Sequence, residues 1–331
     1  MKKLLVLFLL LWSTIAGAVP LVHVGSRGHV ETSAEPGMES VALELQDRAE
    51  DALREIHEDL EGLPEPRTIR LQVVRDASSI ASVAPAGRGA PAYAIGVAYP
   101  DLGVITIATR KDGMLADPTA TLRHELAHIA LGAALGDRAP HWLHEGFAYQ
   151  HSLDFSFDRM ETLAGMAWFH NILPLDELDH SFPAEEAPAN NAYAEAYDFV
   201  GYLARRGRYE DTADDGDRQP FRAFLATLSQ TGNLDTAATQ AYGRPIHVLF
   251  EEWRETLSNR YLLAPIGLLG LAVWVLCAVL LALGWRRRRR QNRVRMEQWE
   301  REERAYDEMI ARLEADRAAQ QQREDDPPLL N

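Results

Sequence analysis

The pentapeptide His-Glu-Leu-Ala-His at residues 124–128 limits the fold of this 331-residue chain more than any other feature. Residues four apart on a helix share a face with their Cβ atoms about 6 Å apart, so His124 and His128 can bind one Zn²⁺. Glu125 is turned roughly 100° from His124, which places its carboxylate beside the metal. A carboxylate there can take a proton from a metal-bound water and pass it to a leaving amine. The motif therefore predicts a zinc centre with Glu125 as general base.

The flanking sequence predicts that this motif lies on a buried helix over residues 118–135. Asp117 and Pro118 are typical of a helix start, and Gly136 is typical of a helix end. Leucine, isoleucine and alanine on both sides of the motif give the helix apolar faces. They disfavour the alternative of two surface histidines on a solvated amphipathic helix.

Catalytic zinc sites keep three protein ligands and one open position, so a third ligand is needed. One known solution continues the motif as H-E-x-x-H-x-x-G-x-x-H. Here Leu131 and Ala134 occupy its glycine and final histidine positions, which excludes it. The next predicted helix, residues 140–152, offers His141, His144 and Glu145 as alternatives.

Residues 140–148 read Pro-His-Trp-Leu-His-Glu-Gly-Phe-Ala. Together with the first motif they resemble the gluzincin metallopeptidases, most closely the bacterial peptidase MA-like domains, whose pattern is H-E-x-x-H followed by Pro-x-Trp-Leu-x-Glu-Gly-x-Ala. The resemblance extends from about residue 21 to about Trp253. It implies that Glu145 is the third zinc ligand and that a peptide or protein is hydrolysed. Many gluzincins have Asp four residues after the ligand Glu, where it orients a histidine; this chain has Tyr149, so that partner is not identified.

Other residues have weaker assignments. Tyr193, in a segment that also resembles the family, is a candidate for stabilising the oxyanion, with core packing as the alternative. Tyr197 lies one turn later on the same predicted helix. His151 and His170 have no partner spacing and are interpreted as structural. The predicted strand 92–98 can offer an open edge to an extended peptide.

The order of periodic segments predicts an α+β fold, with a small N-terminal mixed sheet packed on a mainly helical zincin-like subdomain, plus one transmembrane helix. The strands are expected at 21–24, 29–32, 68–74, 92–98 and 103–109, and the helices at 38–60, 118–135, 140–152, 191–206, 219–230, 234–242 and 245–260.

Two apolar stretches predict how the chain is placed in the cell. Residues 1–18 have the charged start, apolar centre and small-residue end of a signal peptide. Residues 262–285 are uncharged over a length that spans a bilayer, and five arginines follow at 286–290. We therefore expect a single-pass inner-membrane protein, with the domain 19–261 extracytoplasmic or periplasmic and the charged, helical tail 286–331 cytoplasmic. The only cysteine, Cys277, lies in the predicted span.

The charge of the predicted domain and the presence of Glu125 indicate which partners and which function to expect. Residues 19–261 contain 38 acidic and 20 basic residues, which argues against nucleic acid as a partner. The expected partners are a peptide or protein substrate and the lipid bilayer, and a cytoplasmic partner for the tail stays open. A non-catalytic receptor or scaffold with the same fold is the alternative function. The intact Glu125 favours the enzyme, because a scaffold does not need a base.

Overall fold

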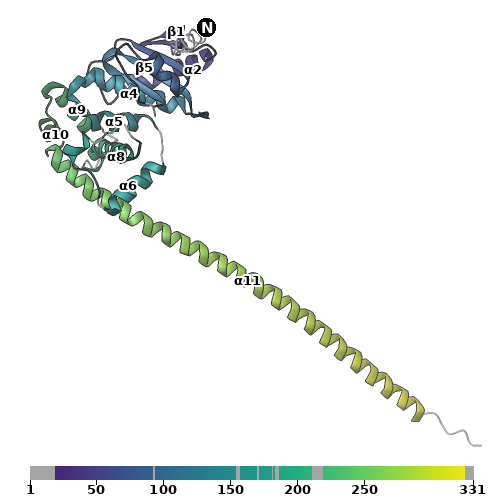
Figure 1. Cartoon of the computed structure of the whole chain (residues 1–331). Coiled ribbons are helices and arrows are strands. Elements are labelled where there is room, and N and C mark those ends of the chain that lie inside the picture. The colour runs from purple at the N-terminus through teal and green to yellow at the C-terminus, as the bar shows by residue number, and fades with distance from the viewer. Residues whose placement is uncertain are drawn as a thin grey trace, which may run out of the picture. The chain divides into compact units, whose positions relative to one another are not determined.

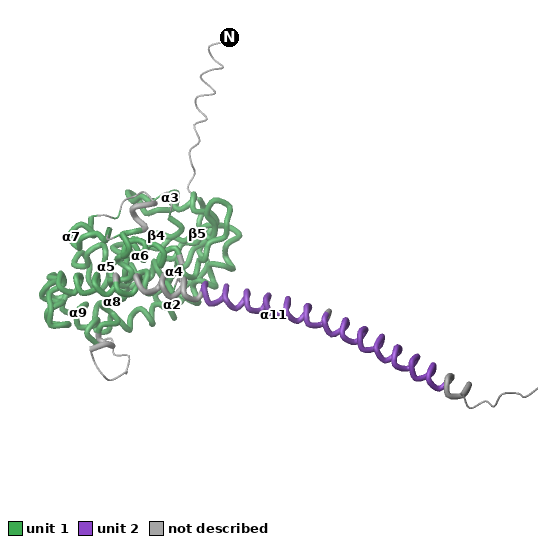
Figure 2. Tube along the Cα trace, turned by 90° about the horizontal axis from the view of Figure 1, so that it is seen from below, with its two compact units in different colours: residues 1–262 green, residues 263–331 purple. Residues whose placement is uncertain are grey.

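The computed structural model describes residues 19–91, 94–153, 157–169, 171–180, 182, 186–210 and 219–324. The chain divides into two compact units, Met1–Leu262 and Leu263–Asn331, which Figure 2 colours separately. Figure 1 labels the larger elements, and in the first unit the strands precede most of the helices along the chain. The predicted signal peptide, residues 1–18, lies outside the described residues.

One mixed sheet forms the N-terminal part of the first unit. Its order is β1-β2-β3-β5-β4, and β6 also pairs with β5. The β1/β2 and β4/β5 pairs are antiparallel, whereas β2/β3 and β3/β5 are parallel. The strands are β1 (Val22–Arg27), β2 (Val30–Ala34), β3 (Ile69–Asp76), β4 (Gly96–Tyr99), β5 (Val104–Lys111) and β6 (Met114–Leu115). Strand β4 is therefore at one edge of the sheet.

Burial explains the central strands. Ile69, Leu71 and Val73 alternate along β3 and are fully buried, as one covered face of a strand requires. In β5, residues 104–108 are buried on both faces, which is typical of a strand next to a parallel partner. Helices α2 (Glu39–His57) and α4 (Pro118–Leu135) pack on each other and on the sheet, where the apolar stripe of α2 is buried.

The second part of the unit is helical. Helix α5 packs mainly on α8, and α9 packs on α10. The start of α11 is held by Trp253, whose Nε1 donates a hydrogen bond of 2.8 Å to Asp198 of α8. The helices are α5 (His141–His151), α6 (Phe157–Phe169), α7 (Leu175–Leu178), α8 (Glu186–Glu210), α9 (Gln219–Thr231), α10 (Leu234–Tyr242) and α11 (Ile246–Glu324); a short α3 (Ile80–Val83) follows β3. The predicted α+β class, with its mixed N-terminal sheet and mainly helical second part, is confirmed.

Some predicted boundaries are wrong. The strand expected at 92–98 is β4, which begins only at Gly96, because the Ala94 N–H bonds back to the Pro91 carbonyl in a turn; residues 92–93 lie outside the described part. The helix expected at 191–206 begins earlier, at Glu186. Helices α6 and α7 were not expected at all.

Within the part of the chain that the structure describes, no helix combines the length and apolar character that crossing a membrane requires. The predicted span 262–285 belongs to α11, and the side chains of residues 262–271 lie outside that part. The tail continues as helix to Glu324.

Candidate metal centre and active site

Helix α4 carries the two histidines of the first motif. Its N-terminus is capped by Asp117, whose side chain accepts hydrogen bonds from the N–H groups of Thr119 and Ala120. Leu122, Leu126 and Ile129 are fully buried on one face of this helix. The Nε2 atoms of His124 and His128 are then 3.2 Å apart, on successive turns of one face.

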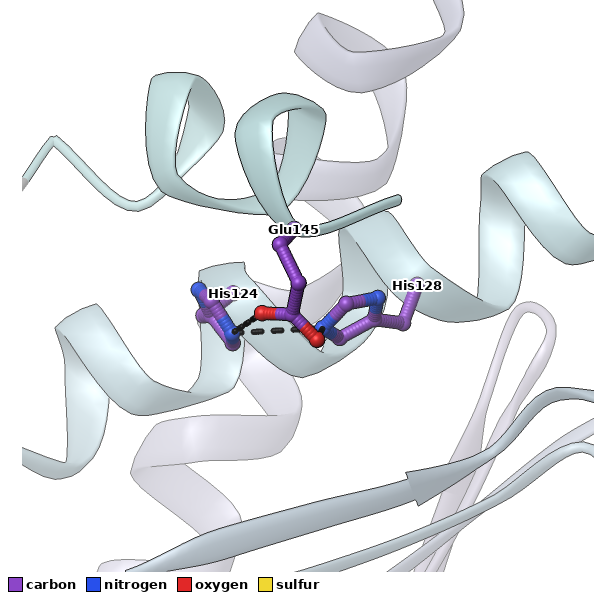
Figure 3. Close-up of side chains that lie close together, drawn as sticks. All are labelled: His124, His128 and Glu145. Atoms are coloured by element: carbon purple, nitrogen blue, oxygen red, sulfur yellow. Dashed lines mark hydrogen bonds and ion pairs between the residues drawn. The ribbon is translucent and has the colours of Figure 1, made fainter. Parts of the chain in front are cut away.

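Glu145 of α5 completes a three-residue group with these histidines. Its Oε2 lies 3.8 Å from Nε2 of His124, and its Oε1 lies 3.8 Å from Nε2 of His128. Figure 3 shows the three side chains pointing toward one another from two helices. Ligands of a tetrahedral zinc at about 2.1 Å lie roughly 3.4 Å from one another, so small side-chain adjustments suffice. Among the described residues, this is the one group of three or more His, Cys, Asp and Glu side chains placed to hold a metal.

Two contacts fix the N-terminal half of α5. Pro140 is at the N-cap position of the helix and provides no side-chain hydrogen bond to cap it. The side chain of Asp179, just after α7, caps the helix instead. Its Oδ1 accepts hydrogen bonds from the N–H groups of His141 at 2.5 Å and Trp142 at 3.4 Å. Gly146 allows α5 to lie directly on α8, because a Cβ built there would be 2.3 Å from the Ala196 carbonyl oxygen.

Arg123 ties the C-terminal end of α5 to the motif helix. Its Nε donates a hydrogen bond of 2.8 Å to the His151 carbonyl, and its guanidinium also pairs with Glu55 of α2. Arg123 directly precedes His124, so this contact between α4 and α5 lies next to a residue of the three-residue group.

The electrostatics of the group suit a metal cation. Burial, followed by the charge of Arg159, lowers the pKa of His124 to about 4. Burial and the neighbouring imidazoles hold the pKa of His128 well below its ordinary value. Both rings are therefore neutral at physiological pH, the form that binds metal. Burial raises the pKa of the Glu145 carboxyl to about 8, so its anion needs a positive charge beside it, and a dication fits this donor set.

Glu125 borders the group without joining it. The side chain is 6% exposed, and the backbone N–H of Ala98 in β4 donates a hydrogen bond to its carboxylate. Burial and the charge of Glu145 raise the pKa of Glu125 to about 8. Its position beside the three donors is the one expected for a base.

The site opens into a cleft of about 610 Å³. One side of the cleft is strand β4 and the turn before it, and the other is formed by α4, α5 and Tyr193 of α8. Gly96 allows strand β4 to lie close to helix α4, because a Cβ at this position would be 2.8 Å from Oε1 of Glu125 and 2.4 Å from Cγ2 of Thr121.

The other residues that the sequence suggested for the site differ in where they lie. His141 and His144 line the cleft but do not belong to the three-residue group, although Nε2 of His141 is 3.4 Å from Oε1 of Glu145. Tyr193 is half-buried and borders the cleft, so its proposed role stays a prediction. His151 pairs with buried Asp59, which agrees with a structural role. His170 lies outside the described residues.

Sequence reasoning did not find the residues that hold the site in place. Asp179, Arg123 and Gly96 act through three-dimensional contacts, and none has a local signal beyond its residue type. Tyr149 had one signal, its place four residues after Glu145, and the structure sets its ring against His124 at 4.5 Å between centroids.

A histidine pair on one helix, a glutamate from the next helix and a second glutamate beside them, all at the edge of a mixed sheet, define a metallopeptidase with a candidate zinc site. The chain belongs to the Peptidase MA superfamily, whose family model matches residues 49–259. The resemblance inferred from the sequence is thereby confirmed.

Comparison with solved structures gives 23 matching chains. One is the native yeast LTA4 hydrolase, with a TM-score of 0.42 and 14% identity. The match covers 72% of this chain and 38% of that chain, so this protein spans well under half the length of that relative. None of the curated proteins matches the chain significantly.

Proposed function

We propose that this protein is a zinc-dependent peptidase in which His124, His128 and Glu145 hold the metal. The observation that carries the proposal is the convergence of these three donors at 3.2–3.8 Å with a buried carboxylate, Glu125, beside them. Zinc bound there supplies a Lewis acid that polarises a carbonyl and lowers the pKa of water to about 7.

The chain's own residues move the proton and bind the substrate. Glu125 takes a proton from water in the cleft and returns it to the amine that leaves when the peptide bond breaks. The N–H of Ala98 orients the Glu125 carboxylate from the side of β4. Tyr193, across the cleft, donates a hydrogen bond to the oxyanion that forms on the carbonyl.

Strand β4 is the proposed binding edge for the substrate. It pairs with β5 on one side only, and residues 96–98 line the cleft on the other. An extended peptide that adds to this edge makes backbone hydrogen bonds and places one of its bonds beside Glu125. A cleft of about 610 Å³ can hold several residues of such a peptide.

The proposal extends to the location of the protein. The signal-peptide pattern of residues 1–18, the uncharged stretch 262–285 and the arginines 286–290 support an inner-membrane anchor. Residues 19–261 are then extracytoplasmic, and the tail is available to a cytoplasmic partner.

The alternative is a non-catalytic receptor or scaffold. It accounts for the fold and the tail, but it gives no reason for a carboxylate buried beside three metal donors.

The experiment measures zinc content and peptide cleavage in the same purified full-length variants. Glu145→Ala and His124→Ala lose zinc and activity, whereas Glu125→Gln keeps zinc and loses cleavage. His144→Ala is the matched control, since it removes a histidine of the cleft outside the metal group, and it keeps its zinc. Wild-type zinc content in Glu145→Ala with an empty His144→Ala would refute the third ligand. A zinc-loaded wild type that cleaves no peptide in a mixed library would favour the scaffold.

A further inference from the structure

One turn beyond Glu145, the same face of α5 carries Tyr149. Its ring meets the ring of His124 edge-on, with 4.5 Å between centroids and 64° between planes. The ring also lies 5.8 Å from that of Tyr193, and Tyr149 lines the cleft. Helix α5 therefore supplies both the carboxylate that faces the two histidines and an aromatic ring that contacts one of them.

Tyr149 is itself held from outside α5. The guanidinium carbon of Arg159, on α6, lies 4.4 Å from the centroid of the Tyr149 ring and 4.5 Å from that of Tyr197 on α8. A guanidinium within about 6 Å of an aromatic centroid is attracted by the electrons of the ring. Arg159 therefore links three helices through two tyrosines, one of which touches His124.

We propose that Tyr149, clamped by Arg159, is the positioning residue for the metal-binding ring of His124. This inference rests on the proposed zinc site. A metal-bound histidine usually gains its orientation from a carboxylate, carbonyl or water that accepts its second N–H. Here an aromatic edge contact limits the rotation of the ring, and the neighbour behind that contact is a cation.

The position of Tyr149 argues against a role in packing alone. The side chain is half-buried and borders the cleft, so it contributes less to the core than a fully buried aromatic residue such as Phe147. A residue that served only stability would not need to touch a ligand.

The experiment measures the zinc dissociation constant of the full-length chain by competition with a chromophoric chelator. Tyr149→Ala should bind zinc about 10–100-fold more weakly, the usual effect of losing a residue that orients a ligand. Tyr149→Phe keeps the ring and should stay within about threefold of wild type. Arg159→Met should weaken binding by about threefold to tenfold, and adding it to Tyr149→Ala should cost nothing further, because both act through one contact.

The pair Tyr202 and Arg206 is the matched control. Arg206 lies over the ring of Tyr202 at 5.5 Å, and neither residue lines the cleft. Tyr202→Ala and Arg206→Met should lower thermal stability and leave zinc affinity unchanged. With Co²⁺ in place of zinc, the visible absorption spectrum should change in Tyr149→Ala and not in Tyr202→Ala.

Wild-type zinc affinity and an unchanged cobalt spectrum in Tyr149→Ala would overturn the inference, as would equal losses of affinity in Tyr202→Ala. If Tyr149→Ala does not fold, Arg159→Met decides, and zinc affinity equal to wild type in that variant overturns the inference. A wild-type chain that binds no zinc would instead refute the proposed function, on which the inference rests.

Discussion

The substitution Gly146→Ala tests whether the position of Glu145 depends on how closely α5 lies on α8. A Cβ at Gly146 would meet the Ala196 carbonyl oxygen at 2.3 Å and Cγ2 of Val200 at 2.4 Å. The first of these atoms belongs to the backbone of a buried helix, so it cannot move without moving α8. To restore ordinary contact, the helices must separate by about 1 Å.

The cost follows from two opposing effects. Alanine favours a helix over glycine by about 1 kcal/mol, whereas overpacking a core costs typically 1–3 kcal/mol and occasionally more. Because the contact is with backbone, we expect the upper part of that range and a net loss of about 1–2 kcal/mol. In a domain of this size, such a loss lowers Tm by roughly 2–8 °C. Glu145 directly precedes the glycine, so zinc affinity should fall by at least about tenfold.

The assay is thermal unfolding of the full-length chain with excess chelator, which removes the contribution of bound metal to Tm. Gly165→Ala is the matched control, because this glycine also lies in a helix, and a Cβ there meets nothing within 4 Å. It should be neutral or raise stability by up to about 1 kcal/mol. A Gly146→Ala protein with the Tm and zinc affinity of wild type would refute the argument.

Three further predictions concern the base, a buried carboxyl and the topology. Gly96→Ala should keep its zinc and lower kcat/KM by about 100-fold, because the new Cβ displaces Glu125; unchanged kinetics would contradict this. Burial raises the pKa of Glu195 from its ordinary value of 4.5 to about 8, so its contribution to stability is present below pH 4.5 and lost as pH rises toward 8. Between those pH values Glu195→Gln should therefore gain stability over wild type, by at most about 5 kcal/mol, and a pH-independent difference in Tm would refute this. Alkaline phosphatase fused after residue 255 should be active and after residue 300 inactive, and the reverse would refute the topology.

The sequence predicted the elements that bear the chemistry because their signals are local. Helix α4 has the predicted bounds 118–135, since an Asp-Pro start and a glycine end both act within one turn. Helix α10 also matches its predicted bounds, from its Asn233 cap to Gly243 in the left-handed region. Strand β3 follows the alternation of Ile69, Leu71 and Val73 closely, and differs by one or two residues at its ends.

The elements that were missed depend on contacts distant in sequence. Helix α6 contains Gly165 and leaves Trp168 and Phe169 exposed, so its apolar residues do not form the single stripe that predicts a helix. Helix α7 has only four residues, Leu175–Leu178, and follows a segment fixed by the hydrogen bond from the Leu173 N–H to Glu195 on α8. Neither helix has a periodic pattern of apolar residues that would predict it. Both nevertheless matter for the site, because α7 leads to Asp179, which caps α5, and α6 carries Arg159.

The burial of the site also explains how metal and base depend on each other. Burial raises the pKa of both Glu125 and Glu145 to about 8, and the charge of Glu145 adds to the effect on Glu125. Two neighbouring carboxyls in such surroundings favour their protonated forms, in which neither can serve as a ligand or a base. A dication among His124, His128 and Glu145 opposes both effects, because it stabilises the anion that binds it and the anion beside it. If these residues hold a metal as proposed, its binding should release protons from the site, and the same event would leave Glu125 as the anion that the proposed base requires.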